Sequence, residues 1–140
     1  MSLGLMALNA AIDARLRPLL PAGMGLGVGY APENLTELAS PIHAHVVPDG
    51  AAPASDVGPQ ARLMAGFTLY VFLDQERIDA TQEAGAYQFF DDAMAHVLGW
   101  QPLDLGECRL VASPSPLAYD GRIGRLEFSF HVPVYVRRAP

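Results

Sequence analysis

Apolar residues near the N-terminus recur at intervals of three and four, the spacing that places them on one side of an α-helix. The positions that follow this spacing are Leu5, Leu8, Ile12, Leu16 and Leu19. Polar residues occupy the other faces, and Pro18, Pro21 and the glycines after them interrupt the pattern. We therefore predict an amphipathic first helix that ends in the region of these prolines.

A second helix is predicted over residues 79–98. Its apolar stripe consists of Tyr87, Phe90, Met94 and Val97. Asp79 or Thr81 can cap its N-terminus by accepting a hydrogen bond from a free backbone N–H. Gly99 stands where helices commonly end in a left-handed residue, and Pro102 prevents the helix from continuing.

Alternation of apolar with other residues predicts three strands and a short fourth one. Residues 41–47 form the first strand, which Pro48-Asp49-Gly50 closes. Residues 62–73 carry apolar side chains on both faces, as is typical of a central strand. Residues 124–138 place on one face Leu126, Phe128, Phe130, Val132, Val134 and Val136. A shorter strand is expected around residues 107–112.

The segments between these elements carry turn residues. Residues 23–30 alternate glycine with apolar residues and form either a short strand or an ordered loop. Residues 50–59 hold almost nothing to bury, which predicts a mobile surface loop. Prolines mark a turn at residues 113–116, and Tyr119-Asp120-Gly121 is a hairpin signal.

This order of elements predicts an α+β fold. Consecutive strands joined by short turns favour a mainly antiparallel sheet of four to five strands, with the two amphipathic helices packed on one face. The 140 residues suit a single domain, residues 1–140, whose core needs neither a metal ion nor a disulfide.

Charge and hydropathy exclude several classes of partner. Fifteen acidic against nine basic residues give a net charge of −6, so no general attraction to nucleic acid or anionic lipid is expected. No apolar run approaches the roughly 20 residues that cross a membrane. The N-terminus lacks the basic start of a secretion signal, so we expect the protein to be made in the cytoplasm.

Two histidines are the candidate metal ligands. His43 and His45 share one face of a strand, so their rings can point at the same ion. A zinc site needs at least a third protein ligand, and no His-Glu-x-x-His or Cys-x-x-Cys motif accompanies them. The pattern favours two histidines on a partly exposed strand, and a metal- or ligand-binding domain that uses them is the alternative.

The other motifs do not indicate an enzyme. Asp91 and Asp92 are neighbours on a helix and point in different directions. The glycines of residues 23–29 lack the Lys-Ser/Thr ending and the following helix of a phosphate loop. Ser113 and Ser115 lie among prolines rather than in a nucleophile elbow. We therefore expect no catalytic residue, no cofactor and no metal.

A few surface positions remain as contact candidates. Trp100 follows the predicted helix end and either covers the core or anchors an interface. Arg137 and Arg138 end the last strand and either face solvent or meet a neighbouring subunit. The single cysteine, Cys108, excludes an intramolecular disulfide and is expected to be a buried strand thiol.

Four segments together resemble the bacteriophage tail terminator family, which includes the lambda-type tail terminators and related small tail proteins. They are residues 11–16 of the first helix, Ala95-His96-Val97-Leu98-Gly99-Trp100-Gln101-Pro102, the turn at residues 117–121, and Leu126-Glu127-Phe128-Ser129-Phe130-His131-Val132. The second segment matches a helix–Leu–Gly–Trp–x–Pro pattern of that family. The glycine-rich stretch and the Pro-Ser-Pro turn have no match in it.

The resemblance implies a structural virion protein and no catalysis. An α+β subunit of this family forms a hexameric ring on the head-proximal end of the tail tube, stops tube polymerisation and joins the tail to the head connector. Its partners would be further copies of itself, the tail tube protein and a connector or neck protein, and DNA would pass through the ring without specific binding. Assembly would take place in the host cytoplasm.

The interface of such a ring is expected at a sheet edge and at the corner formed by residues 98–102. The candidate interface residues are Trp100, Gln101, Arg137 and Arg138. Residues 50–59 are the expected contact with tube or connector, because a mobile loop can order on binding. The alternatives are another ring-forming neck or tail-completion protein, the metal- or ligand-binding domain that uses His43 and His45, and a small intracellular enzyme.

Overall fold

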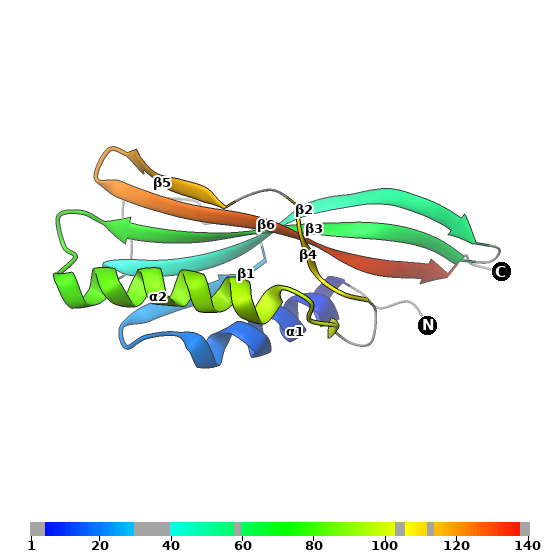
Figure 1. Ribbon diagram of the computed structural model, residues 1–140, viewed down its shortest axis with the longest axis horizontal. Helices are drawn as coiled ribbons and strands as arrows, with labels where there is room; N and C mark the ends of the chain where they lie inside the picture. The colour runs from blue at the N-terminus through cyan, green and yellow to red at the C-terminus, as the bar shows by residue number, and fades with distance from the viewer. Residues whose placement is uncertain (1–4, 30–39, 58–59, 103–105, 112–113, 138–140) are drawn as a thin grey trace.

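The computed structural model describes residues 5–29, 40–57, 60–102, 106–111 and 114–137 (Figure 1). In chain order the elements are α1 (Leu5–Leu16), the 3₁₀ turn η1 (Arg17–Leu19), β1 (Met24–Val28), β2 (Ile42–Val57), β3 (Gln60–Asp74), α2 (Ala80–Val97), β4 (Arg109–Leu110), β5 (Ser115–Asp120) and β6 (Ile123–Arg137). Both predicted helices are present.

Local chemistry fixes the ends of α2. The Asp79 carboxylate accepts a hydrogen bond from the backbone N–H of Gln82 at 2.8 Å, and the Gln82 side chain accepts one from the backbone N–H of Asp79 at 3.0 Å. This capping box satisfies two helix donors reciprocally. Beyond the helix, Gly99 has a φ of 78°, a left-handed backbone that glycine adopts without steric cost.

Six strands form one sheet in the order β1-β2-β3-β6-β4, with β5 also paired to β6. β1 runs parallel to β2, and all the other described pairs are antiparallel. The predicted α+β class and the mainly antiparallel sheet are confirmed, but the sheet has six strands instead of the expected four to five, because residues 24–28 and 115–120 both join it. Residues 24–28 are a strand, which decides between the two possibilities left for the glycine-rich stretch.

One core joins both helices to the sheet. Its fully buried large side chains include Leu8, Ile12, Leu16, Phe67, Phe89, Phe128 and Phe130. The β2–β3 hairpin and the end of β6 extend beyond both helices (Figure 1), so the helices do not form a regular layer over one whole face of the sheet. In the described part of the chain, no helix has the length and apolar character needed to span a membrane.

The prediction of a mobile loop at residues 50–59 is wrong where the structure describes it. Residues 50–57 belong to β2 and pair with β3 in a long hairpin, while residues 58–59 lie outside the described residues. The small and polar residues of this segment show no alternating apolar pattern and therefore carry no strand signal, although the backbone pairs with β3. The register shifts between Pro48 and Gly50 and between Pro53 and Ser55 accommodate the two prolines.

The predictions for two short segments also need correction. The turn expected at residues 113–116 is partly strand, because β5 begins at Ser115 and pairs with β6. The strand expected around residues 107–112 shrinks to Arg109–Leu110, with residue 112 outside the described residues.

Candidate functional site

One face of the sheet carries the polar and aromatic side chains that alternate with the core, and we name it the outer face. Its members are His43 and His45 on β2, Met64, Gly66, Thr68, Tyr70 and Phe72 on β3, and Arg125, Glu127, Ser129 and His131 on β6. Tyr70 and Phe72 stack at 5.8 Å between ring centroids, and the Arg125 guanidinium lies 5.8 Å from the Tyr70 ring centroid.

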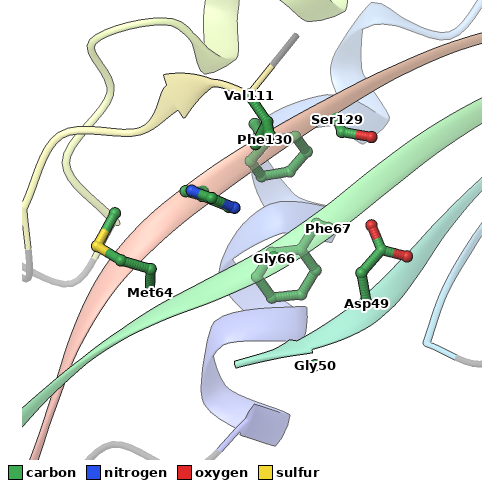
Figure 2. Close-up of a pocket in the computed structure, with 9 residues that line it drawn as sticks. Asp49, Gly50, Met64, Gly66, Phe67, Val111, Ser129 and Phe130 are labelled. Carbon is green, nitrogen blue, oxygen red and sulfur yellow. The ribbon is translucent and has the colours of Figure 1, made fainter. Parts of the chain in front are cut away.

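A cavity of about 360 Å³ opens on this face, with Gly66 among its lining residues (Figure 2). We name it the Gly66 hollow. Its lining comes from four segments: Asp49 and Gly50 of β2, Met64, Gly66 and Phe67 of β3, Ser129, Phe130 and His131 of β6, and Val111 after β4. Phe67 and Phe130 are themselves fully buried and stack at 5.5 Å, so they close the hollow toward the core.

Hydrogen-bonded side chains border one side of the hollow. The buried Thr68 hydroxyl donates to the Asp49 carboxylate, and its oxygen lies 2.8 Å from the Ser129 hydroxyl. Asp49 reaches Thr68 because the register shift between Pro48 and Gly50 inserts it as an extra residue in β2. These hydroxyl groups are engaged with each other and with the carboxylate. The sequence did not predict the hollow. The one related signal was Pro48-Asp49-Gly50, which we interpreted as the end of a strand.

The two histidines and the glycine-rich stretch form one structural feature. Gly25 of β1 pairs with His43 of β2, and Gly27 pairs with His45. A Cβ atom placed on Gly25 would lie 2.9 Å from His43 Nδ1, and one on Gly27 would lie 2.7 Å from His45 Nδ1. The glycines therefore make room for the imidazole rings. This packing explains why glycine alternates with apolar residues here, and a phosphate-binding role is not needed to explain it.

The histidine pair has no third potential metal ligand among the described residues, where no group of three or more His, Cys, Asp or Glu side chains is found. The two ring centroids are 6.0 Å apart. Burial lowers the pKa of His43, and the neighbouring His45 lowers it further. Both effects favour the neutral ring.

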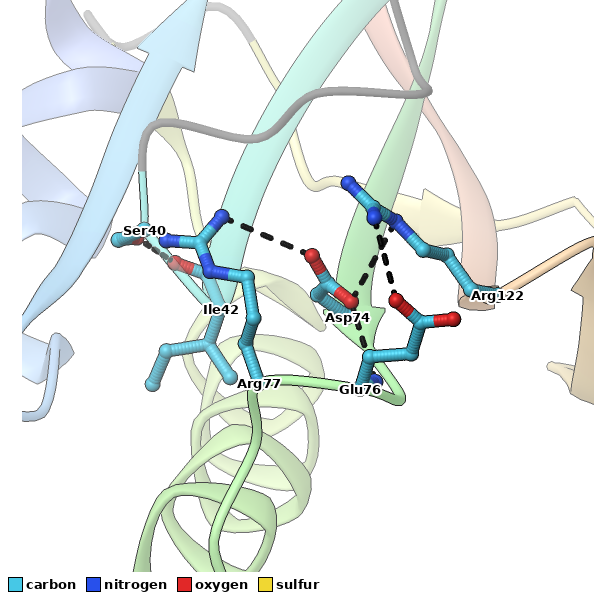
Figure 3. A network of polar contacts seen from close by, with 6 residues as sticks. All are labelled: Ser40, Ile42, Asp74, Glu76, Arg77 and Arg122. Carbon is cyan, nitrogen blue, oxygen red and sulfur yellow. Dashed lines mark hydrogen bonds and ion pairs between the residues drawn. The ribbon is translucent and has the colours of Figure 1, made fainter.

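A charged network ties together the ends of β3 and β6 (Figure 3). Asp74 is fully buried, with Arg77 Nη1 3.6 Å from its Oδ2 and Arg122 Nε 3.7 Å from its Oδ1. Its Oδ1 also accepts a hydrogen bond from the backbone N–H of Glu76. Arg122 contacts the Glu76 carboxylate at 3.3 Å. The arrangement joins the β5–β6 turn to the segment before α2 and is structural.

The predicted interface residue Trp100 lies at the end of α2. The Arg15 guanidinium lies 5.4 Å from the Trp100 ring centroid, while Arg15 Nε donates to the carbonyl of His96 at 3.1 Å. Trp100 is partly buried and packs against the core. Next to it, Leu98 is 58% exposed and Gln101 is exposed. The corner therefore combines a core-covering tryptophan with an exposed apolar side chain.

The structure places the other candidates apart from this corner. Arg137 is the last residue of β6, its side chain is not described, and Arg138 lies outside the described residues. Asp91 is exposed, and the Asp92 carboxylate accepts a hydrogen bond from Gln88. Cys108 is buried as predicted but directly precedes β4 and is not part of a strand. Burial raises the pKa of its thiol to about 12.

Two solved structures have a similar fold. A chain from the virion of a native gene transfer agent particle superposes with a TM-score of 0.60 at 21% identity, covering 94% of this chain and 97% of the other. The PVC sheath/tube terminator of an extracellular contractile injection system, in its extended state, has a TM-score of 0.57 at 13% identity, covering 100% of this chain and 61% of the other. No family model and no curated protein matches the sequence.

Proposed function

We propose that the protein is a tail terminator subunit that forms a homohexameric ring on the head-proximal end of a phage-like tail tube. The observation that carries the proposal is the likeness in fold between this whole chain and 61% of a sheath/tube terminator, joined by a likeness to a chain of a gene transfer agent virion. The resemblance of the helix end at residues 95–102 to the tail terminator family supports the same role.

The sheet offers two unlike edges for a ring contact. β1 ends at Val28, opposite Val46, whereas β2 continues to Val57, so the described strands leave the outer side of residues 47–57 without a partner. On the opposite edge, β4 and β5 accompany β6 only as far as His131. Unpaired strand edges are templates for pairing with another chain. Two different edges suit a head-to-tail contact, which closes a ring when the rotation is right.

Contacts along the tube axis would come from other surfaces. The β2–β3 hairpin extends beyond the helices (Figure 1). This paired hairpin, instead of the mobile loop expected at residues 50–59, would contact the tube or the connector. Trp100, Gln101, Arg137 and Arg138 remain the proposed interface residues. The net charge of −6 is compatible with DNA passing through without sticking, since like charges repel. We propose no catalytic activity.

Tube assembly in the presence of the protein tests this role. Tube protein polymerised with the subunit should give tubes with a ring at one end and no growth from that end, as seen by electron microscopy. Tubes that grow equally from both ends would contradict termination. A ring that binds the connector but leaves tube growth unchanged would indicate the alternative, a neck or tail-completion protein.

A further inference from the structure

Gly66 is an unusual glycine in this protein. Among the described glycines whose backbone is not left-handed, five have a nearby side chain over the position of the missing Cβ. These are Gly25 and Gly27 with histidine rings, Gly85 and Gly106 with proline rings, and Gly124 with Leu117 and Tyr119, all at 3.3 Å or less. At Gly66 the nearest atom would be 3.5 Å away, and the space above it is the Gly66 hollow. The chain itself supplies no group that requires glycine here.

The lining of the hollow defines what it can receive. Met64 and Val111 contribute apolar surface, and Val111 is 49% exposed. The exposed Asp49 contributes a carboxylate, and Ser129 and His131 are the other polar residues of the lining. The complementary group is therefore an apolar side chain accompanied by a positive charge.

The described surface carries one such combination. Its exposed large hydrophobic side chains are Leu98, Val111 and Tyr119. Val111 belongs to the hollow, and the Tyr119 ring lies over Gly124. Leu98 remains, and the exposed Arg15 contacts its near neighbours in the chain, the carbonyl of His96 and the ring of Trp100.

We propose that the Gly66 hollow receives the Leu98 side chain of a second copy of this chain, with Asp49 facing the Arg15 of that copy. The inference rests on the proposed function and adds a side-chain contact to the pairing of strand edges proposed for the ring. The Leu98 side chain lies at the end of α2, whereas the Gly66 hollow lies on the outer face of the sheet. Because the two copies use different surfaces, the contact is head-to-tail. A head-to-tail contact is the kind from which closed rings are made.

Filling the hollow tests the proposal without disturbing the fold. A Cβ at position 66 would make only ordinary contacts, at 3.5 Å from Asp49 Cβ and 3.7 Å from His131 Cδ2. Gly66→Val extends two methyl groups from this Cβ and should weaken self-association by at least about tenfold, and its circular dichroism spectrum checks that the fold is kept. Gly66→Ala, which adds the Cβ alone, should weaken it less. Leu98→Ala should weaken it as Gly66→Val does, whereas the matched control Tyr119→Ala should leave association unchanged.

Disulfide trapping between two single-cysteine variants identifies the contact directly. Leu98→Cys mixed with Gly66→Cys should form a covalent dimer under mild oxidation, and Tyr119→Cys mixed with Gly66→Cys should not. The natural Cys108 is buried and does not compete. If the unmodified protein forms rings but neither pair is trapped, or both are trapped equally, this contact is wrong while the proposed function stands. If it forms no ring, alone or with tube protein, the proposed function and this inference fail together.

Discussion

The imidazole of His43 lies over Gly25 of the parallel neighbouring strand, where a Cβ atom would come within 2.9 Å of His43 Nδ1. The same relationship repeats two residues later between His45 and Gly27. Two features that the sequence presents separately, a glycine-rich stretch and a histidine pair, are therefore one packing arrangement. It fixes β1 against the edge of the sheet.

This arrangement predicts that Gly27→Ala destabilises the protein. The new Cβ would lie 2.7 Å from both Cε1 and Nδ1 of His45, so the ring must move. Overpacking of this kind costs about 1–3 kcal/mol. Urea unfolding measures the loss, and Gly66→Ala is the matched control, because its Cβ meets nothing closer than 3.5 Å.

A double variant separates this packing effect from the propensity of glycine. Adding His45→Ala to Gly27→Ala should recover part of the loss, so that the two substitutions are not additive. Additive effects, or an equal loss for Gly66→Ala, would show that the ring does not occupy the space above Gly27.

Ionisation of His43 should make the protein less stable in mild acid. Burial lowers the pKa of His43 in the folded state below the ordinary value of 6.5, so the unfolded chain binds the proton first. The stabilising contribution is complete above 6.5 and is lost as the pH falls toward the folded-state pKa. The free energy of unfolding in urea should depend less on pH over this range in His43→Gln than in the unmodified protein. An equal pH dependence would show that His43 is not responsible for the loss.

The contacts of the buried Asp74 at the end of β3 predict that removing its carboxylate destabilises the protein. Asp74→Ala removes the acceptor of the Glu76 backbone N–H and leaves Arg77 and Arg122 without this carboxylate. Loss of such buried contacts costs about 1–3 kcal/mol. Glu76→Ala is the control, because its carboxylate is 68% exposed and should contribute less than about 1 kcal/mol. Equal losses in thermal unfolding would show that burial of Asp74 is unimportant.

Cys108 should be unreactive in the folded protein. Its pKa of about 12 keeps the thiol protonated near neutral pH, and thiol reagents attack the thiolate. Iodoacetamide should label the protein only after denaturant is added. Since the pKa is raised on folding, stability should fall as the pH rises from 9.0 toward 12, and Cys108→Ala should remove that part of the decline. Rapid labelling of the native protein would contradict the burial.

Periodicity predicted the helices and the long strands because each carries a regular apolar face. Leu8, Ile12 and Leu16 are buried on α1, and Phe128 and Phe130 are buried on β6, as their spacing required. Residues 50–57 could not be recognised in this way, because they form a strand by pairing with β3 and lack an apolar pattern. Backbone pairing that is not accompanied by an apolar face leaves little trace in a single sequence.

The candidate site was predictable only in part. The corner that combines the exposed Leu98 with the partly buried Trp100 follows from the helix end at Gly99, which the sequence locates. The Gly66 hollow depends on a register shift that turns Asp49 toward Thr68, which no local pattern encodes. Only the three-dimensional structure shows that no side chain of the neighbouring strands covers Gly66 closely.

The native mass of the purified protein, measured alone and with its tube protein, shows whether it forms the proposed ring. We expect a hexamer, or a monomer that becomes a six-fold ring on tube ends. A monomer that ignores the tube and binds zinc through His43 and His45, seen as shifts of their ring resonances, would contradict this expectation.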